Sequence, residues 1–268
     1  MFNLEGKVAL ITGGAGVLGG AMADGLSKAG AKVAILSRTQ SKVDRKAKEI
    51  NYEGGDALAL AADVLDLAQL EKAKEKLLEK WGRLDILINC AGGNMKGATI
   101  MPDQDVFDLS LDDFSSVTDL NLKGTVIPTM VFGKILAEQK KGCIINISSM
   151  AADRTITRVV GYSASKAAVN NFTKWMAVEM INKHGEGIRV NAIAPGFYIA
   201  EQNKGLLLQE NGDLTARGQT IVNNTPMKRF GKPEELVSTV LWLCSDASSF
   251  VTGIVVPVDG GFSAFSGV

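Results

Sequence analysis

The 268-residue sequence is poor in the residues that mark several common kinds of protein. It has one histidine, His184, and only three cysteines, Cys90, Cys143 and Cys244, which are far apart in apolar surroundings. This set has neither the spacing of a zinc site nor the pairing of a disulfide framework. We therefore predict reduced thiols, no metal and a reducing, cytoplasmic location. His184 is predicted to cap the end of a helix.

Neither sign of charge is in excess, since Lys plus Arg and Asp plus Glu each number 29. A protein that neutralises nucleic-acid phosphates would be expected to have a basic excess. No apolar run approaches the roughly 18 residues that a membrane-spanning helix needs. The first residues include Glu5 and lack the apolar segment of a signal peptide. We expect a protein that binds neither nucleic acid nor a membrane.

Short apolar runs alternate with helix-like stretches along the whole chain. The apolar runs are at 8–11, 33–36, 57–61, 86–88, 144–147, 190–193 and 254–258. The helix-like stretches are at 18–29, 41–50, 67–80, 112–138, 162–183 and 233–244. Continuous apolar runs are typical of strands buried on both faces of a parallel sheet. The alternation predicts one α/β domain over residues 1–268, a Rossmann fold whose doubly wound, seven-stranded parallel sheet is flanked by helices. We interpret the long polar segment at about 197–232 as a substrate lid.

A glycine-rich segment stands between the first predicted strand and the first predicted helix. It reads Thr12-Gly13-Gly14-Ala15-Gly16-Val17-Leu18-Gly19-Gly20, in which Gly14, Gly16 and Gly19 have the spacing of dinucleotide-binding loops. Glycine lets the backbone approach a pyrophosphate, and the N–H groups of the helix N-terminus attract it. A glycine-rich turn without a ligand is the alternative, but the strand–turn–helix context favours nucleotide binding.

The end of the second predicted strand bears on the choice of cofactor. An acidic residue there would bind the ribose 2′-hydroxyl of NAD(H), whereas this chain has Ser37 and Arg38. A guanidinium suits a 2′-phosphate because it donates two parallel charged hydrogen bonds. The alternative is a solvated surface arginine. The sequence predicts that NADP(H) is preferred, with NAD(H) as the second option.

Tyr162 and Lys166 are candidates for acid–base chemistry. Residues four apart share one face of a helix, and a nearby ammonium is expected to lower the pKa of the phenol from about 10. Upstream, Ser148 and Ser149 end a predicted strand, where ligand-binding residues gather in parallel sheets. Taken alone, a Tyr-x-x-x-Lys pattern is more often a pair of surface residues than a catalytic pair.

Together these segments resemble the short-chain dehydrogenase/reductase family over essentially the whole chain. The resemblance is carried by Thr12 to Gly19, Asn89-Cys90-Ala91-Gly92, Asn121 within Asp119 to Gly124, Ser149 thirteen residues before Tyr162, Tyr162 with Lys166, Pro195-Gly196, and the ending Val258-Asp259-Gly260-Gly261. Three positions depart from the family pattern. Val17 replaces a glycine, Cys90 replaces an asparagine, and Ala200 stands where a threonine often binds the nicotinamide carboxamide.

The resemblance implies a homotetrameric enzyme that reversibly reduces a carbonyl to an alcohol with NAD(P)H. It implies that Ser149 holds the substrate carbonyl, that Tyr162 exchanges the proton and that Lys166 binds the ribose and tunes Tyr162. Asn121 is expected to hold a water that links Lys166 to solvent. Cofactor binding is expected from Gly13, Gly14, Gly16, Val17, Leu18, Gly19, Ser37, Arg38, Asp63, Val64, Asn89, Ala91, Gly92, Tyr162, Lys166, Pro195 and Gly196.

The polar composition of 197–232 suits a hydroxylated substrate better than a steroid or a long acyl chain. Arg154 and Arg158 stand between Ser149 and Tyr162, where an arginine would bind a carboxylate. Three segments resemble the D-mannonate oxidoreductase branch most and gluconate 5-dehydrogenase-like enzymes next: Gly93-Asn94, Gly196-Phe197 leading to Glu201-Gln202-Asn203, and the ending Phe262 to Val268. This resemblance implies reduction of a sugar acid of the D-fructuronate type. The predicted substrate-binding residues are Asn94, Ser149, Arg154, Arg158, Tyr198, Gln202 and Asn203.

Two other functions remain open from the sequence. A 3-oxoacyl-thioester reductase would share every catalytic motif. A dinucleotide-sensing module without activity would share the fold, but would be expected to lack at least one of Asn121, Ser149, Tyr162 and Lys166, all of which are present.

Overall fold

The computed structural model describes residues 2–200 and 203–267. Within them lies one seven-stranded sheet with the strand order β3-β2-β1-β4-β5-β6-β7, and every neighbouring pair is parallel. The strands are β1 Val8–Thr12, β2 Lys32–Ser37, β3 Ala57–Ala61, β4 Ile86–Asn89, β5 Gly142–Ile147, β6 Ile188–Pro195 and β7 Val255–Val258. The order reverses between β1 and β4, which confirms the predicted doubly wound Rossmann fold.

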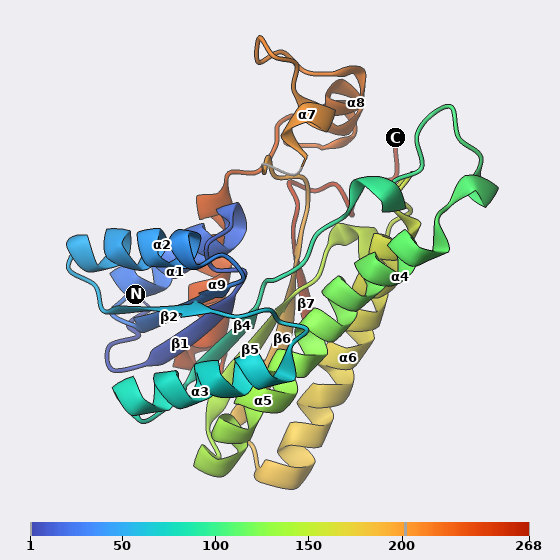
Figure 1. The fold of residues 1–268 in the computed structure, drawn as a ribbon. Coiled ribbons are helices and arrows are strands. Elements are labelled where there is room, and N and C mark those ends of the chain that lie inside the picture. Colours follow the sequence, from blue (N-terminus) through green and yellow to red (C-terminus); the bar gives the residue numbers. More distant parts are fainter. Residues whose placement is uncertain (1, 201–202, 268) are drawn as a thin grey trace.

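Helices cover both faces of the sheet (Figure 1). One apolar core joins the sheet to α1 Val17–Lys28, α2 Gln40–Tyr52 and α9 Val237–Cys244. A second core joins the other face to α3 Leu67–Trp81, α5 Gly124–Gln139 and α6 Val160–His184. Successive residues of β1 alternate between the two cores, because side chains of a strand point to opposite faces. This double burial accounts for the uninterrupted apolar runs of the sequence.

The predicted helix over 112–138 is interrupted, so that prediction is wrong in its middle. The segment forms α4 Leu111–Thr118, a π-helical turn Asp119–Lys123 and then α5. The side chain of Asn121 donates to the carbonyl of Val117 at 2.8 Å and so takes an acceptor that a regular α-helix would use. Pro128, inside α5, adds a position without an N–H donor. Such π turns recur at functional sites.

The segment at 197–232 has more structure than its composition predicts. It contains α7 Lys204–Leu207 and α8 Ala216–Asn224, which stand beyond the carboxyl ends of the strands (Figure 1). Thr215 caps α8 by accepting a hydrogen bond from the backbone N–H of Gly218 at 3.0 Å. The predicted start of the last long helix at Pro233 is a 3₁₀ turn, Pro233–Leu236, that continues into α9.

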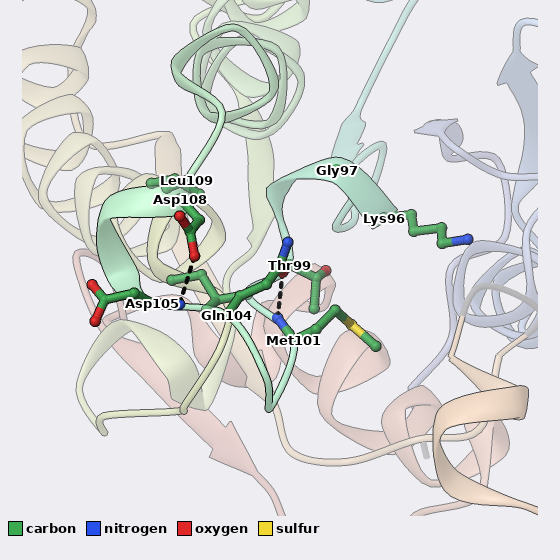
Figure 2. A pocket seen from close by; sticks show the side chains of 9 residues that line it. Lys96, Gly97, Thr99, Met101, Gln104, Asp105, Asp108 and Leu109 are labelled. Carbon is green, nitrogen blue, oxygen red and sulfur yellow. Dashed lines mark hydrogen bonds between the residues drawn. The ribbon is translucent and has the colours of Figure 1, made fainter.

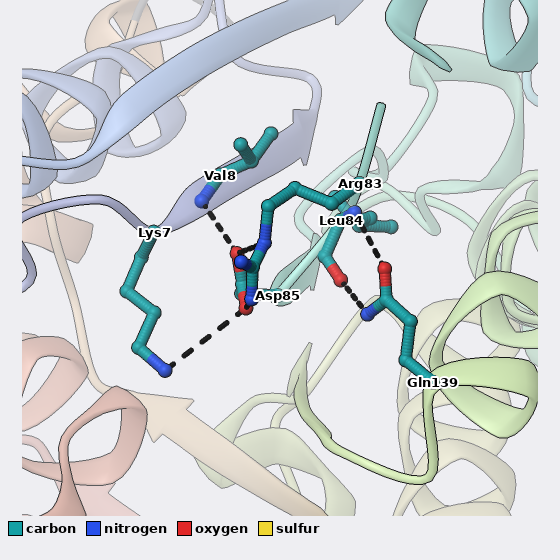
Figure 3. Close-up of polar contacts among 6 residues, drawn as sticks. All are labelled: Lys7, Val8, Arg83, Leu84, Asp85 and Gln139. Carbon is teal, nitrogen blue, oxygen red and sulfur yellow. Dashed lines mark hydrogen bonds and ion pairs between the residues drawn. The ribbon is translucent and has the colours of Figure 1, made fainter. Parts of the chain in front are cut away.

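The amino ends of the strands are joined by a buried carboxylate, Asp85 (Figure 3). Its Oδ2 accepts hydrogen bonds from the backbone N–H of Val8 and from Nε of Arg83, both at 2.9 Å. The nearby side chain of Gln139, from α5, accepts from the backbone N–H of Leu84 at 3.3 Å. These contacts fix β1, β4 and α5 to one another at this edge of the sheet. The carboxyl ends of the strands lie at the opposite edge of the sheet.

None of the helices in the described part of the chain is long and apolar enough to cross a membrane.

Candidate active site

The family-like motifs converge at the carboxyl edge of the sheet. Thr12 ends β1, Asn89 ends β4, Ile147 ends β5 and Pro195 ends β6. In a doubly wound sheet this edge forms the ligand crevice, because the chain departs in opposite directions on either side of the point where the strand order reverses. The sequence-predicted residues that follow these strands are therefore brought to one side of the molecule.

Lys166 is the central charged group of the site. Its residue is 4% exposed, and its ammonium donates to the carbonyl of Ile147 at 2.7 Å. The same Nζ lies 5.6 Å from the centre of the Tyr162 ring, one helical turn earlier on α6. Burial lowers the pKa of Lys166 to about 8, because the charged form loses its hydration. The ammonium therefore titrates close to neutral pH.

The pKa of Tyr162 is raised, so the predicted fall is wrong for the polypeptide by itself. Burial disfavours the phenolate and is the largest cause, while a hydrogen bond with Ser149 acts in the opposite direction. Tyr162 is thereby kept protonated. The hydroxyl of Ser149 also accepts from the backbone N–H of Ala151 at 3.1 Å, which holds it in place.

Asn121 connects the π turn to the strand-end segment after β4. Its Nδ2 donates to the carbonyl of Gly93 at 2.7 Å, and its Oδ1 accepts from the N–H of the same residue at 3.0 Å. A Cβ on Gly92 would meet Asn121 Oδ1 at 2.7 Å and Lys166 Nζ at 3.3 Å, so glycine is needed for this packing. The side chain of Asn121 therefore positions the turn that packs against Lys166.

Cys90 was not singled out as a site residue by the sequence, although its thiol belongs to this cluster. Burial raises the pKa of its thiol to about 11, and the positive charge of Lys166 lowers it in part. The thiol is thus held protonated beside the lysine. Only its departure from the family pattern marked this position in the sequence.

The glycine-rich turn has the shape that a dinucleotide phosphate requires. Gly13 has a φ of +66°, and a Cβ on Gly19 would lie 2.3 Å from the carbonyl oxygen of Gly13. Gly16 precedes α1 without any side-chain cap, so the first-turn N–H groups of Val17 and Leu18 have no side-chain acceptor among residues 2–200 and 203–267. Thr12 Oγ1 accepts from two backbone N–H groups after β4, at 3.0 and 3.1 Å, which joins this turn to the rest of the site. These residues fit a nicotinamide dinucleotide whose pyrophosphate lies at the N-terminus of α1.

The residues predicted to contact the adenosine end lie beside β2 and β3. Ser37 is partly buried and Arg38 is exposed at the end of β2. Asp63 accepts from the N–H of Leu65 at 2.9 Å, and Val64 is buried against Gly124. The structure thus leaves the charge of Arg38 accessible at this end.

Two predicted asparagines each retain a buried carbonyl oxygen without a partner in the described part of the chain. Asn89 uses its Nδ2 on Thr129 and Asn146, each at 2.9 Å. Asn94 donates to Thr99 at 2.6 Å. A buried unpaired oxygen is costly, so both atoms fit a donor from a bound dinucleotide or substrate.

The predicted lid residues use their polar groups within the protein. Tyr198 is buried and its hydroxyl donates to the carbonyl of Val258 at 3.0 Å, while burial raises its pKa to about 12. Asn203 bonds to the backbone of Ala200 and Tyr198, each at 2.8 Å. Gly196 packs closely on Asp259. Gln202 lies outside the described residues.

A cavity of about 300 Å³ is formed within residues 96–109 (Figure 2). The hydrogen bonds between Met101 and Gln104 and between Asp105 and Asp108, both 2.8 Å, shape its wall. Its lining contains none of the predicted catalytic residues. No group of three His, Cys, Asp or Glu residues that could hold a metal occurs in residues 2–200 and 203–267.

Fold and site together define a nicotinamide-dinucleotide-dependent oxidoreductase. A family model described as enoyl-(acyl carrier protein) reductase matches residues 14–263. An uncharacterized oxidoreductase of Bacillus subtilis, UxuB, is 50% identical, with 99% of this chain and 98% of the relative covered. The chain belongs to the short-chain dehydrogenase/reductase family and acts on CH–OH groups.

Two solved structures are similar over almost their whole length. A Haemophilus influenzae protein provisionally named D-mannonate oxidoreductase, with bound NAD, has a TM-score of 0.91 and 44% identity, covering 99% of this chain and 98% of its own. A gluconate 5-dehydrogenase from Burkholderia cenocepacia, in complex with NADP and tartrate, has a TM-score of 0.87 and 31% identity, covering 98% of each chain. These comparisons extend the family assignment to NAD(P) binding.

Replacing Lys166 with methionine is expected to stabilise the protein without cofactor at pH 7, by up to about 3 kcal/mol. The pKa of Lys166 falls from 10.5 to about 8 on folding. Below pH 8 Lys166 is protonated in both the folded and the unfolded protein. Burial of the ammonium then lowers the free energy of unfolding of the wild type by the full amount of about 3 kcal/mol. Between pH 8 and 10.5 the folded protein releases its proton first, so the stability difference between variant and wild type should shrink. Urea unfolding of both proteins across pH 7 to 10.5 measures this difference in stability.

The control for this experiment is Lys183→Met, an exposed lysine of the same helix. Its stability difference from wild type should be small at pH 7. A Lys166→Met difference that stayed constant from pH 7 to 10.5 would contradict the buried ammonium.

Proposed function

We propose that the enzyme reversibly reduces the keto group of a sugar acid to the alcohol, as in D-fructuronate to D-mannonate, with NADP(H) preferred. The observation that carries the substrate class is the set of basic side chains around the loop before α6. Arg154 and Arg158 stand between Ser149 and Tyr162, and Arg217 of α8 contacts Thr157 of the same loop. The similarity to the Haemophilus protein supports the same class.

Each residue of the site has a separate role in the proposed reaction. Ser149 donates a hydrogen bond to the carbonyl oxygen, and Tyr162 delivers its hydroxyl proton to that oxygen as the alcohol forms. A nicotinamide cofactor held by the glycine-rich turn and Lys166 would supply the hydride that the carbonyl carbon accepts. Lys166, whose Nζ lies 5.6 Å from the centre of the Tyr162 ring, would bind the ribose and stabilise the negative charge left on Tyr162. In the direction of oxidation the same groups remove the proton.

Tyr162→Phe should retain cofactor binding and lose activity by about 10²- to 10⁴-fold, because only the proton-transfer group is removed. Steady-state turnover and NADPH fluorescence titration measure the two effects separately. Tyr52→Phe, at an exposed tyrosine of α2, is the matched control and should behave as wild type. Activity above a tenth of wild type in Tyr162→Phe would exclude this tyrosine as the general acid.

The substrate class is tested by reduction of D-fructuronate, 5-keto-D-gluconate and acetoacetyl thioester under identical conditions. We expect turnover of a keto sugar acid, with D-fructuronate favoured, because the basic side chains attract a carboxylate. Efficient turnover of the thioester alone would assign the chain to 3-oxoacyl-thioester reduction. Absence of turnover with intact NADPH binding would favour a dinucleotide sensor.

NADPH should give a higher kcat/KM than NADH, since Ser37 ends β2 and Arg38 follows it, with no acid at either position. Arg38→Ala should lower kcat/KM for NADPH by about tenfold or more, the effect of losing a charged hydrogen bond, and leave NADH almost unchanged. Arg45→Ala, on the exposed face of α2, serves as the control. A higher kcat/KM for NADH, the cofactor named for the Haemophilus structure, would make Arg38 a surface charge only.

The protein is proposed to be a cytoplasmic homotetramer. The adjacent helices α5 and α6 leave Met130, Trp175 and Val178 exposed, at 44%, 58% and 60%. Exposed apolar side chains of this size are commonly covered by a symmetry-related copy. Light scattering should return four chain masses, and a monomer mass at micromolar concentration would contradict the tetramer.

A further inference from the structure

Arg217 extends from the first turn of α8 to the loop that precedes α6. Its Nη2 and Nη1 lie 3.4 and 3.5 Å from the carbonyl and hydroxyl oxygens of Thr157. Both distances are at the long end for hydrogen bonds. A guanidinium has five N–H donors in a planar fork, so most of the donor capacity of Arg217 remains available beside Thr157.

Arg158, the next residue along this loop, is held in an unusual backbone conformation. Its φ is +77°, a region that side-chain-bearing residues seldom adopt. The carbonyl of Arg158 accepts from the N–H of Ile100 at 3.0 Å, so the segment after β4 fixes this conformation. Non-glycine residues in such conformations cluster at ligand sites, where surrounding contacts hold them. The backbone of Arg158 is therefore positioned by tertiary contacts.

Arg217 contacts Thr157, the residue before Arg158, so the two arginines bring positive charge to the same loop. Burial and the charge of Arg158 both lower the pKa of Arg217. Arg217 also stands at the positive end of the α8 dipole. In residues 2–200 and 203–267 the arginines that form ion pairs are Arg45, Arg83 and Arg229. Arg158 and Arg217 thus form an electropositive pair that an anion would neutralise.

Arg154 has a different environment, although the sequence placed it beside Arg158. It is exposed and donates to the backbone carbonyl of Ser263 in the C-terminal segment. Its guanidinium is thereby directed to the chain terminus. The pair that is available to an anion consists of Arg158 and Arg217.

We propose that Arg158 and Arg217 together bind the carboxylate of the substrate and that this anion fastens α8 over the active site. The proposal rests on the proposed function, and it assigns the charged group of that substrate to two residues on separate elements. Arg158 precedes Tyr162 by four residues, a path of at most about 15 Å between Cα atoms. A carboxylate between the guanidiniums would therefore lie within reach of a sugar acid whose keto carbon is at Tyr162.

Binding of D-mannonate to the enzyme–NADPH complex tests the pair directly. Ligand and cofactor are both in their reduced forms, so no reaction takes place and calorimetry gives a dissociation constant. Arg158→Met and Arg217→Met should each raise this constant about 10- to 100-fold, the effect of losing a charged hydrogen bond. Arg45→Met should leave it unchanged. D-Mannitol, which has the hydroxyl groups without the carboxylate, should bind weakly and equally to all four proteins.

Hydrogen exchange supplies a second readout that does not depend on activity. D-Mannonate should slow exchange of the α8 backbone amides in wild type, because the anion links α8 to the loop before α6. The same protection should be absent in Arg158→Met, whose substitution lies outside α8. Arg217→Lys, which keeps the charge without the planar fork, should give an intermediate affinity. Unchanged NADPH affinity shows that each variant is folded.

The outcomes separate this proposal from the proposed function. If wild type reduces D-fructuronate and both methionine variants bind D-mannonate within twofold of wild type, the arginine pair is overturned and the function stands. If wild type binds D-mannonate through both arginines but reduces no keto sugar acid, the site stands and the function fails. If wild type binds neither D-mannonate nor D-gluconate, the pair is overturned as well.

Discussion

The ammonium of Lys166 is buried at the end of the central strands, and its recorded hydrogen bond is to a backbone carbonyl, that of Ile147. A charge in such a place is costly unless it is paired. The Cys90 thiol and the Tyr162 ring are nearby, and a Cβ on Gly92 would lie 3.3 Å from Lys166 Nζ. Its depressed pKa is the direct consequence. The surrounding residues therefore pack around an ammonium whose charged form is destabilised by burial.

That constraint explains irregular features nearby. Asn121 and Lys166 leave no room for a side chain at position 92, which is therefore glycine. Asn121 binds Gly93 from a π turn that interrupts a long helix. Regular α-helical hydrogen bonding is given up at that turn. Loss of regular helical structure beside the candidate active site is expected when function and stability compete.

Among the described residues, the polar groups are paired at the amino ends of the strands and partly unpaired at the carboxyl ends. At the amino ends, Asp85 has its charge and hydrogen bonds satisfied by Arg83 and Val8. At the carboxyl ends, Asn89 and Asn94 keep buried oxygens that have no partner within residues 2–200 and 203–267, and the charge of Arg158 acts on Arg217. A parallel sheet allows this separation because every strand presents the same end to the same edge. In the proposed function, a dinucleotide and an anionic substrate provide partners for these groups.

The sequence by itself determined the strand and helix alternation, the glycine turn and the spacing of Tyr162 and Lys166, because each depends on local periodicity or on neighbours along the chain. Only the tertiary structure decided properties that depend on burial or on distant contacts. It raised the pKa of Tyr162 instead of lowering it, because desolvation exceeds the effect of the hydrogen bond with Ser149. It also brought Arg217 to Thr157 across 60 positions and turned Arg154 toward Ser263. Composition and spacing carry no record of such contacts, since they arise only when separate elements pack together.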